Sequence, residues 1–189
     1  MLFRSLDSTN QKPKAEPLYR EALEIYRRLA KDSPETYEAD MTTTCNNLAV
    51  LLDSINQKPE AETLFREALE IQRRLAKDNP AAYEAAMATT CNNLANLLNS
   101  INQKTEAEQL YQEALEILSC LTKDNPDVYE TDLAATCNNL ASLLDSINQK
   151  PEAEKLLREA LEIYHRLAKD NPVAYEAAKI GRASCRERV

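Results

Sequence analysis

The chain repeats itself with a period of 46 residues. The stretch from Thr89 to Leu98 has counterparts at Thr43 to Leu52 and at Ala135 to Leu144, each displaced by that period. The residues that follow recur too, as Ser-Ile-Asn-Gln-Lys, Glu-Ala-Glu, Glu-Ala-Leu-Glu-Ile and Lys-Asp-(Asn/Ser)-Pro. Such a period is typical of proteins in which one structural unit is copied and each copy packs on its neighbours.

The composition favours helices in every repeat. The 189 residues include a single glycine and no tryptophan, and most of the others are good helix formers such as Ala, Leu, Glu, Lys and Arg. No apolar run approaches the ~20 residues that a membrane-spanning helix requires. An all-α fold without a membrane-spanning helix is therefore expected.

Each repeat contains two helical segments whose ends are marked by recurring residues. A serine or asparagine followed by proline, at 33–34, 79–80, 125–126 and 171–172, predicts an N-cap and a first helical residue. Asn56, between two such segments, is expected to take a positive φ because no glycine is available there. We expect an unpaired helix over 13–31, antiparallel helix pairs over 34–77, 80–123 and 126–169, and a truncated helix over 172–179.

We call the first helix of each pair the A helix and the second the B helix. At 100° per residue the A helix of the first pair has one apolar face and one polar face. The B helix has apolar residues at three- and four-residue spacing. The pairs Glu62–Arg66 and Glu70–Arg74 are expected on its solvent-facing side. The expected core comprises Cys45, Leu48, Ala49, Leu51, Leu52 and Ile55 from the A helix, and Ala61, Leu64, Phe65, Ala68, Leu69 and Leu75 from the B helix.

These positions carry a specific resemblance. Cys45, Asn47-Leu48-Ala49, Leu52, Ala61, Phe65 and Ala68 fall at the spacings of the tetratricopeptide repeat signature. Asn-Asn-Leu-Ala, Glu-Ala-Glu and Glu-Ala-Leu-Glu-Ile resemble more particularly the long repeats of kinesin light chains and their bacterial relatives. The resemblance implies a right-handed all-α solenoid that binds an extended peptide or a partner helix in a concave groove lined by A helices, as a non-catalytic scaffold.

The polar face of successive A helices supplies the candidate groove residues. Amide side chains both donate to and accept from a peptide backbone, so a row of asparagines is suited to hold one. The alternative is that some of these amides cap or bridge neighbouring A helices. The residues are Thr43, Asn46, Asn47, Val50, Asp53, Thr89, Asn92, Asn93, Asn96, Asn99, Asn138, Asn139, Ser142 and Asp145.

Charge narrows the class of partner. The formal net charge is −8 at pH 7, and the polar faces over 42–54, 88–100 and 134–146 contain no basic residue. A nucleic acid requires clustered Lys and Arg, and so does a clamp for a C-terminal carboxylate. We therefore expect a neutral to basic protein or peptide partner, and neither a nucleic acid nor an anionic membrane.

No residue pattern indicates catalysis or a bound cofactor. Cys45, Cys91 and Cys137 recur with the repeat and are expected to be small core residues, while Cys120 stands alone on a B helix. His165 is the only histidine and is expected to face solvent. We predict no enzyme activity, no cofactor and no metal, and the reduced cysteines favour the cytoplasm.

The two ends depart from the repeat. Residues 1–5 and 180–189 resemble translated sequencing adapter, so the solenoid is expected to occupy 6–179 as an internal fragment of a longer, metagenomic gene. The alternative function is a structural array, in which apolar repeat faces at both ends self-associate end to end.

Overall fold

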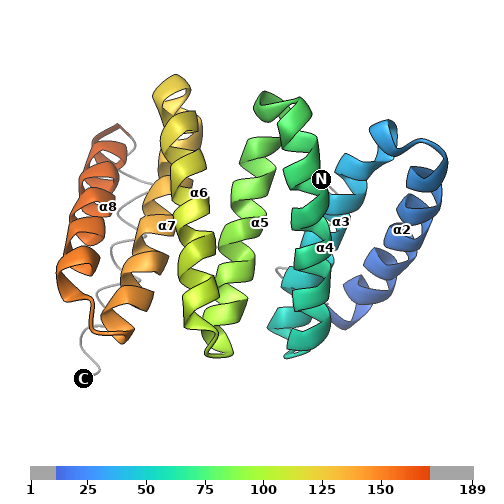
Figure 1. Ribbon diagram of the computed structural model, residues 1–189, viewed down its shortest axis with the longest axis horizontal. Helices are drawn as coiled ribbons and strands as arrows, with labels where there is room; N and C mark the ends of the chain where they lie inside the picture. Colours follow the sequence, from blue (N-terminus) through green and yellow to red (C-terminus); the bar gives the residue numbers. More distant parts are fainter. Residues whose placement is uncertain (1–11, 171–189) are drawn as a thin grey trace. The chain divides into compact units, whose positions relative to one another are not determined.

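The computed structural model describes residues 12–170, and every element in this range is a helix (Figure 1). The predicted end segments 1–5 and 180–189 and the predicted helix 172–179 lie outside these residues, so the domain bounds stay a prediction. The A helices are α3, α5 and α7, and the B helices are α2, α4, α6 and α8. Their bounds are α2 Lys12–Asp32, α3 Pro34–Ser54, α4 Lys58–Asp78, α5 Pro80–Ser100, α6 Lys104–Asp124, α7 Pro126–Ser146 and α8 Lys150–Asp170.

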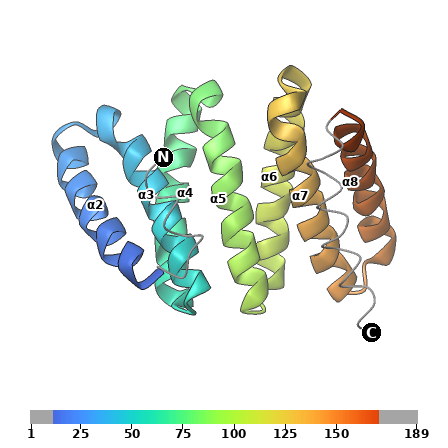
Figure 2. The same cartoon turned by 180° about the vertical axis from the view of Figure 1, so that it is seen from behind.

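The helices form two compact units whose boundary lies between Ala114 and Leu115, inside α6. In the first unit α2 packs on α3, α3 on α4 and α4 on α5, and α5 also contacts α3. In the second unit α7 packs on α8, and the two lie side by side in both views (Figures 1 and 2). The predicted all-α fold of antiparallel helix pairs is confirmed.

Proline opens each A helix, as the sequence predicted. Pro34, Pro80 and Pro126 are the first residues of α3, α5 and α7, where the absent N–H costs no hydrogen bond. Asn79 caps α5, because its side chain accepts from the Ala82 N–H at 3.3 Å. Ser33 and Asn125 are the N-cap residues of α3 and α7, as predicted, but their side chains make no cap bond. Their backbone carbonyls still accept the first helical N–H bonds, so α3 and α7 begin at the same register.

Asparagine ends each A helix in the left-handed conformation. Asn56, Asn102 and Asn148 have φ values of 65°, 66° and 65°, which confirms the prediction for Asn56. The Asn56 N–H donates to Asp53 O at 2.9 Å, and the Gln57 N–H donates to Leu52 O at 2.8 Å. These two bonds satisfy carbonyls that the helix end leaves open, as in a Schellman motif. The reversal into each B helix is therefore encoded by asparagine in place of glycine.

Replacing Asn102 with valine should destabilise the protein by about 1–2 kcal/mol, because a β-branched side chain clashes with the backbone at positive φ. Replacement with glycine, which adopts this conformation freely, should be close to neutral. Urea unfolding followed by far-ultraviolet circular dichroism measures both variants. Gln103→Val is the control, since Gln103 is exposed and the substitution keeps its N–H. Equal stability of the valine and glycine variants would show that the turn does not depend on this conformation.

The core follows the predicted faces with two exceptions. All predicted B-helix core residues are buried except Leu75, which is half-buried. On α3, Ile55 is 37% exposed because it lies just past the helix end, so its assignment to the core was wrong. Thr42 and Thr44 are buried instead, because their hydroxyls donate to the carbonyls of Ala39 and Asp40 at 2.9 Å each. A hydroxyl satisfied within its own helix can enter the core at small cost.

None of the helices between residues 12 and 170 combines the length and the hydropathy that crossing a bilayer requires.

Candidate functional site

None of the fourteen predicted groove residues is buried, so the polar face of each A helix remains accessible. The side chains of one half of the set are exposed and those of the other half are partly covered by neighbours. Val50, the one large apolar member, is 45% exposed. The exposed members are Thr43, Asn47, Val50, Thr89, Asn96, Ser142 and Asp145, and the partly covered ones are Asn46, Asp53, Asn92, Asn93, Asn99, Asn138 and Asn139.

Several of these side chains also make internal hydrogen bonds. In the first unit the Asn93 Nδ2 donates to the Asn46 Oδ1 at 3.3 Å and links the A helices α5 and α3. The Tyr111 hydroxyl donates to the Asn96 Oδ1 at 2.8 Å. Part of the asparagine row is thus engaged between helices, which was the alternative interpretation of these amides. An amide has four hydrogen-bonding sites, so one internal bond leaves it able to bind a ligand.

In the second unit three predicted residues line one cavity. Its volume is about 480 Å³, and it lies between the A helix α7 and the B helix α8. The Asn138 Nδ2 donates to the Tyr164 hydroxyl of α8 at 3.3 Å, which holds the amide beside the cavity. The lining residues are Asn138, Ala141, Ser142, Asp145, Lys150, Ala153, Glu154 and Leu157.

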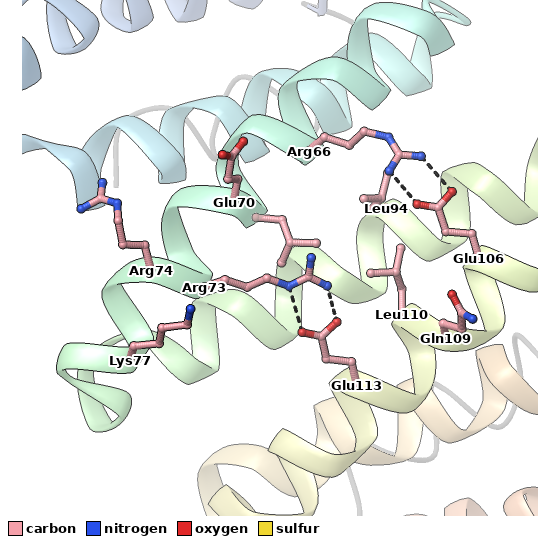
Figure 3. A pocket seen from close by; sticks show the side chains of 11 residues that line it. Arg66, Glu70, Arg73, Arg74, Lys77, Leu94, Glu106, Gln109, Leu110 and Glu113 are labelled. Carbon is pink, nitrogen blue, oxygen red and sulfur yellow. Dashed lines mark hydrogen bonds and ion pairs between the residues drawn. The ribbon is translucent and has the colours of Figure 1, made fainter.

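A larger cavity of about 810 Å³ lies on the B helices of the first unit and contains none of the predicted residues. Figure 3 shows two arginine–glutamate pairs that bridge it from α4 to α6. Arg66 donates to both carboxylate oxygens of Glu106 at 2.6 and 2.9 Å, and Arg73 binds Glu113 in the same forked way. These bonds raise the pKa of Arg66 and lower the pKa of Glu106. Arg66 and Arg73 are thus already paired with carboxylates. We therefore regard this cavity as an interface between helices and not as the ligand site.

Equivalent arginine–glutamate pairs join α2 to α4. The ion pairs therefore form a ladder along the B helices of the first unit. Arg20 binds Glu60, and Arg27 binds Glu67, again with two bonds each. Every pair links residues 40 apart in sequence. We name these four pairs the arginine–glutamate ladder. It was not predicted, because the sequence alone shows only the neighbours within one helix.

The predicted pairs within the B helix had mixed outcomes. Arg66 contacts Glu62 at 2.9 Å, as predicted. The prediction that Arg74 pairs with Glu70 is wrong, because Arg74 reaches across to Glu38 of the A helix α3. A half-buried carboxylate on the neighbouring helix is a stronger partner than an exposed one on the same helix. Arg166 and Glu130 make the equivalent contact between α8 and α7.

The repeated cysteines are small core residues, as predicted. Cys45, Cys91 and Cys137 are buried, and all the cysteines within residues 12–170 are free thiols. Burial raises the pKa of each of the three buried thiols to about 12, so they stay protonated at neutral pH. Cys120 and His165 are exposed.

The comparisons with known proteins match the repeat seen in the structure. The tetratricopeptide repeat family model matches residues 4–35, 42–81, 87–118 and 133–173, which together are more than half of the chain. The chain belongs to the tetratricopeptide repeat family. The predicted tetratricopeptide solenoid fold is confirmed, whereas its handedness and its closer likeness to kinesin light chains stay predictions.

Among solved structures, the crystal structure of BtubC (BKLC) from P. vanneervenii resembles this tetratricopeptide chain with a TM-score of 0.70 and 24% sequence identity. The match covers 90% of this chain and 62% of BtubC, so the chain spans less than two thirds of the length of that relative. The sequence matches no curated protein significantly. The family assignment makes the chain a protein-interaction scaffold at the level that tetratricopeptide repeats share.

Proposed function

We propose that this tetratricopeptide protein is a non-catalytic scaffold that binds an extended peptide or a partner helix along the polar faces of its A helices. The observation that carries the proposal is the accessibility of these faces in successive repeats, none of whose predicted groove residues is buried. The B-helix surface of the first unit offers fewer free groups, because the arginine–glutamate ladder engages them. The A helices are therefore the better surface for a ligand.

The chemistry of this face selects a neutral or basic partner. Its charged members are Asp53 and Asp145, and no lysine or arginine lies on α3 between residues 42 and 54. Val50 adds an exposed apolar contact for a side chain of the ligand. Affinity should then depend little on salt, because neutral hydrogen bonds dominate. We include in the proposal a location in the cytoplasm and the exclusion of nucleic acid and membrane as partners, on the basis of the acidic charge and the free thiols.

The second candidate function is a self-associating array. It is favoured by leucine and isoleucine side chains that remain exposed on α2 and α8. Leu18 and Ile25 are 43% and 42% exposed on α2, and Leu157 and Leu161 are 48% and 53% exposed on α8. Apolar side chains in such clusters are common where two proteins meet.

Light scattering over a wide range of protein concentration distinguishes the two functions. A peptide-binding scaffold should keep the mass of a monomer at all concentrations. An array should grow in mass as concentration rises, and Leu157→Lys with Leu161→Lys should stop the growth. A partner for the scaffold is then sought by affinity capture, and the groove proposal stands only if the captured partner is lost from the groove variant described in the Discussion. Growth in mass, together with a captured partner that binds the groove variant as well as the parent, would support the array.

A further inference from the structure

One hydrogen bond in the first unit ties a predicted groove residue to the B helix that follows it. The hydroxyl of Tyr111 on α6 donates to the Oδ1 of Asn96 on α5 at 2.8 Å. Tyr111 is 1% exposed, whereas Asn96 is exposed. Burial raises the pKa of the Tyr111 hydroxyl to about 12, so this group keeps its proton at neutral pH. A buried hydroxyl needs an acceptor, and Asn96 supplies it.

This bond also orients the Asn96 amide. An amide side chain accepts through its oxygen and donates through its nitrogen. The Asn96 Oδ1 accepts from the buried hydroxyl of Tyr111, so the Nδ2 on the other branch of the amide remains available on the exposed side of the residue. Asn96 is therefore a donor of fixed direction on the polar face of α5.

The equivalent positions of the preceding repeat contain neither group. Val50 on α3 stands where Asn96 stands, and Phe65 on α4 stands where Tyr111 stands. Val50 is 45% exposed and Phe65 is 1% exposed, so this pair likewise has an exposed A-helix residue and a buried B-helix residue. The amide thus occurs in the repeat that has the hydroxyl, and the repeat without the hydroxyl has an apolar side chain in its place.

We propose that this pair of positions determines which ligand side chain each repeat accepts, an inference that rests on the proposed peptide-binding function. Val50 accepts an apolar side chain. Asn96, held by Tyr111, donates from its Nδ2 to the side-chain carbonyl oxygen of an asparagine or glutamine. A carboxylate is disfavoured as the acceptor, because Asp53 lies on the same polar face and residues 42–54 and 88–100 include no lysine or arginine. Tyr111 is a positioning residue, and Val50 and Asn96 determine specificity.

The two side chains of the ligand should lie about three residues apart. The A helices α3 and α5 contact each other, and the axes of packed helices are about 8–10 Å apart. A peptide in the polyproline II conformation rises about 3.1 Å per residue and has three residues per turn, so three residues span ~9 Å. The first and fourth side chains then point the same way. The expected ligand is a peptide with an apolar side chain and, three positions away, an amide.

The test gives the second repeat the chemistry of the first. Peptides are selected from a phage-displayed library of random short sequences, on the full-length parent and on the variant Asn96→Val with Tyr111→Phe. This variant copies the pair Val50 and Phe65. The parent should select peptides with one apolar side chain and one amide, and the variant should select peptides with two apolar side chains at the same spacing. Both new residues already occur at equivalent positions of the fold, so the circular dichroism spectrum should match the parent.

Tyr111→Phe alone tests the positioning role. Fluorescence anisotropy of a selected, fluorescein-labelled peptide should show binding weakened by about fivefold, the factor for one neutral hydrogen bond of ~1 kcal/mol. With Asn96→Ala already present, Tyr111→Phe should have no further effect, because Tyr111 acts through Asn96. In the free protein, NMR relaxation should show a more mobile Asn96 side-chain amide in the Tyr111→Phe variant. The matched control is Tyr19→Phe, which alters a buried tyrosine at the same position of α2 and should change neither measurement.

The outcomes separate this proposal from the proposed function. If no peptide is selected, or if the selected peptides bind the groove variant described in the Discussion as well as the parent, binding of an extended peptide in the groove is overturned, and this proposal with it. If the peptides are lost from the groove variant but the parent and the Asn96→Val, Tyr111→Phe variant select the same sequences, the groove stands and the role of these residues in specificity is overturned. Equal mobility of the Asn96 amide with and without the Tyr111 hydroxyl would overturn the positioning role.

Discussion

Phe65→Ala should lower the free energy of unfolding by about 3–5 kcal/mol, the usual cost of removing a buried aromatic side chain. Phe65 is 1% exposed, and it lies on the B helix α4, which packs on both α3 and α5. The loss combines the hydrophobic free energy of burying the ring with the cost of the cavity that its removal leaves in the core. Because neighbouring repeats depend on each other for their core, the effect should reach beyond α4.

Leu157→Ala is the matched control, since Leu157 occupies the equivalent position on α8 and is 48% exposed. It should cost less than about 1 kcal/mol, as for most surface substitutions. Urea unfolding by far-ultraviolet circular dichroism gives both values, and hydrogen exchange shows whether α5 loses protection with α4. A similar cost at the two positions would mean that the side chain of Leu157 is buried in solution as Phe65 is.

Replacing Asn47, Asn93 and Asn139 together with alanine should weaken binding of the groove partner by about 2–4 kcal/mol, at roughly 1 kcal/mol per neutral hydrogen bond and with imperfect additivity. These residues occupy the same position on α3, α5 and α7, so the variant removes one row of amides from the proposed groove. The far-ultraviolet dichroism should not change. Stability should fall only slightly, because the bond from Asn93 to Asn46 is long, at 3.3 Å, and partly exposed.

The control is Gln109→Ala with Gln112→Ala, which removes two exposed amides from the B helix α6. Gln109 lines the larger cavity, so the pair also tests that surface. Titration calorimetry with the captured partner should show a loss for the groove variant and none for the α6 variant. The reverse result would place the ligand on the B helices, and normal binding with a greatly lowered melting temperature would make the asparagines structural.

The repeat was sufficient to predict the fold, because local rules and packing rules agree in this chain. Proline at helix starts, asparagine at positive φ and apolar stripes at helical spacing all act over a few residues, and each can be seen in one repeat. The differences from the prediction occur at helix ends. Ile55 belongs to the apolar stripe, but the helix ends just before it. Ser33 has a hydroxyl that could cap α3, but its side chain makes no cap bond.

The candidate site was less predictable than the core. The sequence shows that the asparagines share a face, but the bond between Asn93 and Asn46 depends on how far apart two A helices lie. The arginine–glutamate ladder likewise depends on how neighbouring helices are placed. A spacing of 40 residues has no meaning until α4 and α6 are known to lie beside each other in a fixed register. Long side chains reach across helices, so their partners follow from tertiary geometry.

The arginine–glutamate ladder also determines how such a chain can change in length. Each rung joins an arginine to a glutamate in the next B helix, and the first two steps use the same pair of positions. If residues 58–103 were duplicated in tandem, Arg66 would meet the new copy of Glu60, and the new copy of Arg66 would meet Glu106. Every rung would be rebuilt without a further substitution. An insertion of any other length would place unlike residues opposite each other, so duplication of whole repeats is the change in gene length that this surface tolerates.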